Sequence, residues 1–105
     1  MRLLEFNINA QKIEKAPDCN FDGIVAGTSG YLKARFTFSS EWEKCVKVAQ
    51  FWRASEEYAV LIKDNMCEIP PEVLTGATFR VSVIGQRGDY RIPTNKVLIR
   101  QEVPK

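Results

Sequence analysis

The sequence predicts a single all-β domain, a sandwich or small barrel of about seven or eight short strands with one or two short helical turns. Apolar and polar residues alternate with a period of two in several segments, which is typical of half-buried strands. Glycine, proline, asparagine and aspartate mark turns about every 8–12 residues. The length of 105 residues suits one domain, and residues 1–105 show no internal repeat, low-complexity tract or linker.

An N-terminal strand is predicted because Leu4, Phe6 and Ile8 alternate with polar residues. Glycines and a serine mark a turn at 27–30. Residues 31–38 follow with the clearest alternation in the chain, which predicts a strand buried on one face. That face holds Leu32, Ala34, Phe36 and Phe38.

The segment 39–58 carries two competing patterns. Ser40 and Glu43 match a capping box, which indicates a helix start. The residues that follow also alternate as a strand would. A short helical turn at 39–42 followed by a strand at 45–53 satisfies both patterns, and strand is favoured over helix for the second part.

Residues 58–70 predict a hairpin, because two β-rich runs flank Asp64 and Asn65, which tolerate left-handed backbone conformations. The proline pair at 70–71 ends the second run. The stretch that follows predicts one helical turn closed by Gly76.

The C-terminal part predicts further strands at 77–85, 90–93 and 95–103. In the first of them the inward residues are Phe79, Val81 and Val83.

The loop between these strands contains Arg87-Gly88-Asp89, a tripeptide that also serves as a cell-adhesion ligand. A hairpin needs residues that accept positive φ, and Gly85 and Gly88 are expected to supply them. A motif of three residues is common by chance and needs supporting context. A structural turn is therefore favoured over a receptor ligand, with Arg87 and Asp89 projecting from its tip.

Composition and charge argue against several classes of function. The net charge of +2, from 15 basic and 13 acidic residues, is too even to indicate nucleic acid or an anionic membrane as the partner. The longest apolar run, 58–62, is too short to cross a bilayer, and residues 1–11 lack the apolar core of a signal peptide, so we expect a protein made in a cytoplasm. The chain has no histidine and no Walker or nucleophile-elbow motif. We expect no enzyme, no metal and no cofactor.

The three cysteines, Cys19, Cys45 and Cys67, are far apart and form no zinc-binding pattern. One disulfide with a leftover thiol is possible on number alone. Three reduced, mostly buried thiols fit a cytoplasmic product better.

Aromatic residues cluster at 42–58, where core packing is favoured and a protein–protein contact is the sharper alternative. Basic residues beside Tyr31, at Lys33 and Arg35, leave a nucleic-acid face conceivable, although the even charge disfavours it. The candidate interaction surface comprises Trp42, Phe51, Trp52, Tyr58, Arg87, Asp89 and Tyr90.

Nearly the whole chain, from Leu3 to about Ile99, resembles small proteins and N-terminal domains encoded among the tail and baseplate genes of phages and prophages of Gram-positive bacteria. The resemblance rests on the order of segments such as "GYLKARFTFSSEW" and "YAVLIKDNMCEIPPEVL". Its most telling parts are the Phe-Ser-x-Glu-Trp turn at 38–42, the Ile-Pro-x-Glu-Val-Leu turn at 69–74 and the ending "TNKVLI" at 94–99. These parts are corners and strand ends, and none of them is catalytic.

The resemblance implies an immunoglobulin-like β-sandwich, similar to the N-terminal domain of upper baseplate proteins. It also implies a non-enzymatic structural protein of the virion, an attachment or connector module whose partners are other virion proteins or further copies of itself. Two alternatives stay open: a small nucleic-acid-binding β-barrel, and a phage-encoded inhibitor of a host protein. The resemblance supplies no binding residues that transfer position by position.

Overall fold

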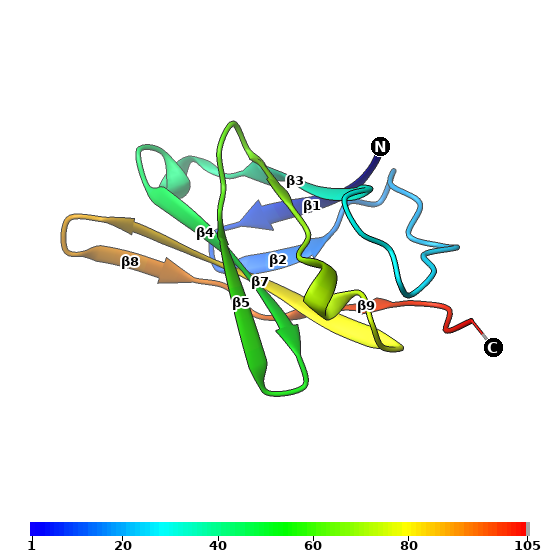
Figure 1. Cartoon of the computed structure of the whole chain (residues 1–105). Coiled ribbons are helices and arrows are strands. Elements are labelled where there is room, and N and C mark those ends of the chain that lie inside the picture. The colour runs from blue at the N-terminus through cyan, green and yellow to red at the C-terminus, as the bar shows by residue number, and fades with distance from the viewer. Residues whose placement is uncertain (105) are drawn as a thin grey trace.

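The computed structural model describes residues 1–104 and shows two β-sheets packed as a sandwich (Figure 1). The prediction of an all-β sandwich is confirmed. The strands of the described residues are β1 (Arg2–Asn9), β2 (Lys12–Lys15), β3 (Leu32–Phe38), β4 (Val46–Arg53), β5 (Glu56–Leu61), β6 (Met66–Glu68), β7 (Thr78–Arg87), β8 (Tyr90–Pro93) and β9 (Val97–Arg100). Two single turns of 3-10 helix accompany them, η1 (Ser40–Trp42) and η2 (Pro71–Val73).

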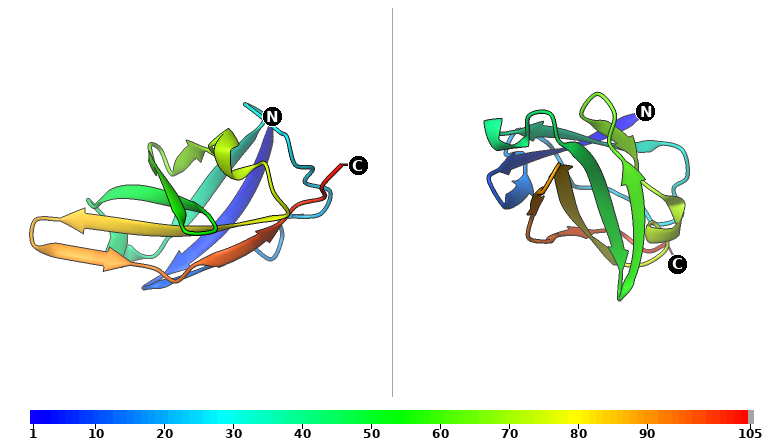
Figure 2. Two further views of the ribbon diagram at one scale, coloured as in Figure 1. Left: turned by 60° about the horizontal axis from the view of Figure 1, so that its bottom comes forward. Right: turned by 90° about the vertical axis from the view of Figure 1, so that its left-hand side faces the viewer.

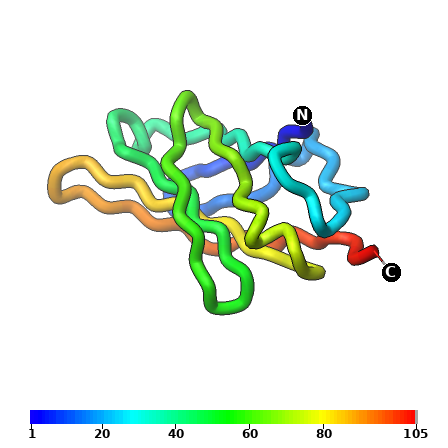
Figure 3. The backbone as a smooth tube through the Cα atoms, in the orientation of Figure 1, coloured from blue at the N-terminus to red at the C-terminus, as the bar shows by residue number. Residues whose placement is uncertain are grey.

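The four-stranded sheet has the order β2-β1-β3-β6. Its inward residues on β1 are Leu4, Phe6 and Ile8, each at most 2% exposed, as the alternation predicts. β1 pairs with β3 in parallel, with Phe6 opposite Phe36. Parallel neighbours need a long crossover. Here the crossover includes residues 16–31, which run around the end of the sandwich where both termini lie (Figure 3).

The five-stranded sheet is built on β7, its longest strand. The order is β5-β4-β7, and beyond β7 two short strands follow one another along its length. β9 pairs with Thr78–Val81 and β8 with Ile84–Arg87. In the left-hand view of Figure 2 the β7–β8 hairpin reaches past the rest of the sandwich, away from both termini.

The core between the sheets is one contiguous hydrophobic cluster. A file of aromatic rings runs through it, with centroids 5.6 Å apart for Phe6 and Phe36, 5.9 Å for Phe36 and Phe38, and 5.3 Å for Phe38 and Trp42. Fully burying a side chain of this kind stabilises the fold by about 1.5–3 kcal/mol. Burial in this core therefore explains why apolar residues alternate with polar ones in the segments predicted as strands.

One strand, β2, has no counterpart among the predicted strands. Its sequence, Lys-Ile-Glu-Lys, offers a single apolar residue, Ile13, which is 1% exposed. The turn before it places Ala10 at a φ of 51°, where glycine or asparagine is the usual signal. The short apolar run at 23–27 forms no strand and contributes only an isolated bridge between Val25 and Glu102.

The predicted hairpin at 58–70 is wrong in its pairing. Asp64 and Asn65 do form a tight turn with φ of 54° and 61°, closed by the bridge between Lys63 and Met66. The strands on either side then separate, because β5 pairs with β4 in one sheet while β6 pairs with β3 in the other. The turn is a corner between the two sheets.

Both helical turns and the strand after the first are present where predicted, but their caps differ. The residue that precedes η1 is Ser39 and makes no capping bond, so the box of Ser40 and Glu43 is not formed. η2 ends at Val73 with Leu74 as its C-cap, and Gly76, which was predicted to close it, does not have positive φ. Each of these short turns ends in a residue that is buried in the core, Trp42 in η1 and Val73 in η2. This burial stabilises turns that are too short to be stable alone.

Candidate interaction surface

The structure divides the predicted interaction residues into buried and accessible ones. Trp42 and Phe51 have no exposed surface, so the prediction that they offer a contact surface is wrong. Both face the core, where large aromatic side chains bury the most apolar area. The remaining five do not form one patch. Trp52 lies on the outside of the five-stranded sheet, Tyr58 packs against the core, and Arg87, Asp89 and Tyr90 lie at the tip of the β7–β8 hairpin.

The Arg-Gly-Asp segment forms a hairpin turn that is tied to the loop beside it. Gly88 takes a φ of 59°. The Arg87 guanidinium donates to the carbonyl of Glu43 at 3.0 Å and lies 5.3 Å from the centre of the Tyr90 ring. The Tyr90 hydroxyl donates to the carbonyl of Glu41 at 3.1 Å. Both flanking side chains thus hold the hairpin in place, which supports the structural interpretation of this tripeptide.

Gly85 has a different role from the one predicted. It lies inside β7 without positive φ, opposite Ile92 and Lys47. A Cβ at this position would lie 2.7 Å from the Trp42 ring and 3.2 Å from Ile92. The glycine therefore provides room for the buried indole, a demand that no turn pattern reveals.

The outer face of the five-stranded sheet, the face turned away from the core, carries a chain of polar contacts across three strands. The Trp52 indole donates to Ser82 Oγ at 2.9 Å, and Ser82 donates to Gln50 at 2.9 Å. Gln50 in turn donates to Glu57 at 2.7 Å. The Lys96 ammonium lies 3.7 Å from the centre of the Trp52 ring. Lys96 therefore occupies one face of the ring, while the ring edge is held by Ser82, which is 3% exposed.

An apolar row crosses the same face next to this polar chain. Leu61, Val48, Ile84 and Pro93 lie opposite one another in register on β5, β4, β7 and β8. Val46 extends the row along β4 and is 62% exposed, while Leu61 is 49% exposed. An apolar row on an outer sheet face, ending at a strand edge, is a feature of surfaces that contact other proteins.

One side of the sandwich is closed by hydrogen bonds between the sheets. Asn95, just after β8, accepts from the amide of Ile13 at 2.8 Å and donates to its carbonyl at 3.2 Å. The backbone amide of Asn95 donates to the backbone carbonyl of Gln11. The side chain of Gln11 in turn donates to the carbonyl of Pro93. These bonds join the β1–β2 hairpin to the chain between β8 and β9, and we call this region the closed side.

The opposite side ends in β5, whose outer edge is open. Ile62 donates its amide to Lys47, so the residue pairs that bond β4 to β5 are 60 with 49 and 58 with 51. In an antiparallel ladder these pairs alternate with pairs that do not bond. The amides and carbonyls of Glu57, Ala59 and Leu61 therefore point away from β4. We call this edge the open edge; within residues 1–104, no other segment makes a backbone hydrogen bond to it.

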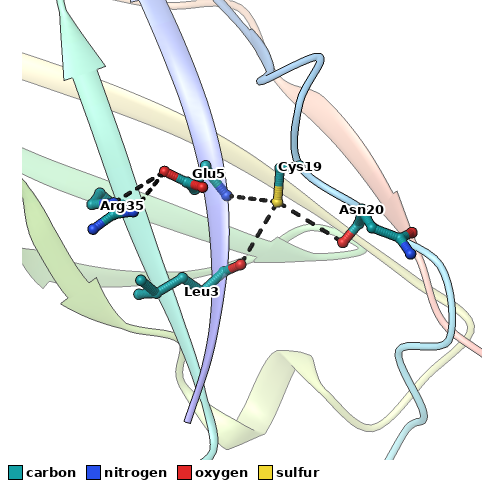
Figure 4. Close-up of polar contacts among 5 residues, drawn as sticks. All are labelled: Leu3, Glu5, Cys19, Asn20 and Arg35. Carbon is teal, nitrogen blue, oxygen red and sulfur yellow. Dashed lines mark hydrogen bonds and ion pairs between the residues drawn. The ribbon is translucent and has the colours of Figure 1, made fainter.

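The face that carries Tyr31, Lys33 and Arg35 is less free than the sequence indicates. Arg35 donates to the Glu5 carboxylate at 2.9 Å and 3.1 Å, and Figure 4 shows this pair beside the contacts of Cys19. The ion pair neutralises one of the two cations that a nucleic-acid backbone would need.

The three cysteines are free thiols. Cys45 and Cys67 are buried, and burial, with a smaller contribution from Glu68, raises the pKa of the Cys67 thiol to about 12. Cys19 is partly exposed and accepts a hydrogen bond from the amide of Glu5 at 3.4 Å (Figure 4).

Within 1–104, no three histidine, cysteine or acidic side chains come together as a metal site would require. None of the helices described is long and apolar enough for a membrane span. Compared with protein-family models and with curated proteins, the chain has no match.

Proposed function

We propose that this chain is a non-enzymatic structural protein of a phage or prophage particle, and that it serves as an attachment or connector module of the tail, the baseplate or the particle surface. The observation that carries the proposal is the open edge of β5 beside the apolar row on the outer sheet face. The resemblance to tail and baseplate proteins supplies the setting.

The geometry favours assembly through a protein contact. An uncovered edge strand presents free amides and carbonyls, and a strand of another protein satisfies them while its side chains cover neighbouring apolar surface. Leu61 belongs to both features, since it lies on the edge strand and ends the apolar row. Particles are built from repeated copies, so a modest contact is multiplied by symmetry.

The nucleic-acid alternative has weaker support on both sheets. Bases stack on aromatic rings that are free on one side. Lys96 lies over Trp52, and Arg35 is paired with Glu5. An inhibitor of a host protein would use the same edge and apolar row. The presence or absence of the protein in particles distinguishes this function from that of a virion module.

Mass spectrometry of purified particles induced from the source bacterium tests the proposal. We expect peptides of this chain in stoichiometric amounts relative to other tail proteins. A chain carrying Ala59→Lys, which places a charge on the open edge, should be depleted from particles, whereas the matched Ala77→Lys should be retained. Abundant protein in the lysate with none in the particles would overturn the proposal.

A further inference from the structure

We propose that the open edge of β5 binds a second copy of this chain, with the two β5 strands antiparallel and Ala59 opposite Ala59. The inference names the partner of the surface described above and to that extent rests on the proposed function. It makes a continuous sheet from the five-stranded sheets of two copies.

The pattern of free backbone groups selects the register. The outward-pointing amides and carbonyls belong to alternate residues, 57, 59 and 61. Pairing about Ala59 places 57 opposite 61 and 59 opposite itself, so every free group of the strand finds a partner, in about six hydrogen bonds. Pairing about Tyr58 would bring 61 against the turn at 55, and pairing about Val60 would bring 57 against Lys63, which already bonds Met66. Those registers leave free groups unsatisfied.

The side chains agree with this register. Tyr58 would face Val60 of the second copy at a pair that does not bond, where side chains approach closely and an aromatic with a β-branched residue is favourable. Both are partly buried against the core already, so the contact would extend that packing. Ala59, small and exposed, would lie at the two-fold axis and leave room for both backbones.

Charges do not oppose the pairing. Glu57 would face Leu61 of the second copy, so no two carboxylates lie directly opposite. Glu56 is held by Arg53 at 3.0 Å, and this ion pair lowers the pKa of the Glu56 carboxyl. Strands that avoid pairing usually carry a lysine, a proline or a bulge on their edge. Residues 56–61 contain neither lysine nor proline.

Cysteine cross-linking tests the register directly. In a Cys19→Ser background, Ala59→Cys should form a covalent dimer under mild oxidation, because facing Cα atoms in a bonded pair lie about 5.5 Å apart, within the range of a disulfide. Glu57→Cys and Leu61→Cys should each stay monomeric alone and link when mixed. Ala77→Cys, an exposed alanine away from β5, is the matched control and should not link.

Sedimentation equilibrium measures the affinity without cross-linking. The unmodified chain should associate to a dimer with rising concentration. Ala59→Lys should weaken dimerisation by at least about tenfold, because two ammonium groups would meet at the axis, while Ala77→Lys should leave it unchanged.

Two results would overturn the inference: a chain that stays monomeric up to about 1 mM, or cross-linking at Ala77→Cys as strong as at Ala59→Cys. The proposed function has a separate outcome. If the chain is monomeric yet Ala59→Lys is lost from particles, the edge binds a strand of a different virion protein. If the chain dimerises but is absent from particles, the second copy stands and the virion role fails.

Discussion

The closed side and the open edge differ in whether the backbone groups at the edge of a sheet find hydrogen-bond partners. On the closed side, Asn95 and Gln11 bond the exposed backbone of one sheet to the other, and Trp42 donates its indole N–H to Ala10 at the neighbouring turn, at 2.9 Å. On the open edge, β5 leaves alternate backbone groups free and carries the exposed Leu61. Uncovered strand edges are a hazard that folded proteins normally blunt. The edge left open, opposite the side that is closed by hydrogen bonds, is therefore the surface that we propose for binding.

The largest expected effect lies on the closed side, at Trp42. Its ring is fully buried and lies against Gly85, so Trp42→Ala would leave a large cavity. We expect the free energy of unfolding to fall by about 3–5 kcal/mol in urea denaturation. A loss below about 1 kcal/mol would show that Trp42 does not anchor this side.

Asn95→Ala should be the next largest. It removes both hydrogen bonds to Ile13 and leaves an amide and a carbonyl without partners, which costs about 1–3 kcal/mol of unfolding free energy. Asn95→Asp keeps the acceptor and loses the donor, so its loss should be smaller. Equal stability of all three proteins would mean that water replaces these bonds and that the side is not closed by them.

Trp52, between the two sides, should behave differently from Trp42. It is half-buried on the outer face, so Trp52→Ala should leave the fold intact and cost about 1 kcal/mol, mainly its bond to Ser82. Trp52→Phe keeps the ring beneath Lys96 and isolates the contribution of that bond. Binding to particles should weaken in Trp52→Ala. Failure of this variant to fold would place Trp52 in the core and remove it from the interaction surface.

The smallest effect on stability belongs to the open edge. Ala59→Lys should change the unfolding free energy of the monomer by no more than about 0.5 kcal/mol, since the side chain is exposed and the backbone group is unpaired. Urea denaturation at low protein concentration measures this without interference from association. A loss comparable to that of Asn95→Ala would show that the edge packs within its own chain.

The sequence predicted the fold well where the burial of a strand's own residues set their pattern. Alternation at Leu4, Phe6 and Ile8 and along 31–38 predicts buried strand faces, and the structure has them. The prediction failed where the structure of a segment depends on residues from another part of the chain. Gly85 is small because a tryptophan from another segment lies on it, and β2 exists because β1 and Asn95 pair with it.

The interaction surface was harder to predict for the same reason. Aromatic residues mark both cores and interfaces, so Trp42 and Trp52 were indistinguishable in the sequence. Their burial differs because one precedes β4 and turns inward while the other lies on its outer face. The open edge depends on strand order, which periodicity does not encode: Asp64 and Asn65 predict a hairpin, yet the strands part into different sheets and leave β5 uncovered.

The most direct test of the open edge is amide hydrogen exchange, measured residue by residue by NMR in a dilute and a concentrated sample. In the dilute chain, Glu57, Ala59 and Leu61 should exchange fast while Tyr58 and Val60, bonded to β4, exchange slowly. In the concentrated sample all five should become slow. Fast exchange of the first three under associating conditions, with protection appearing on another strand instead, would contradict the account.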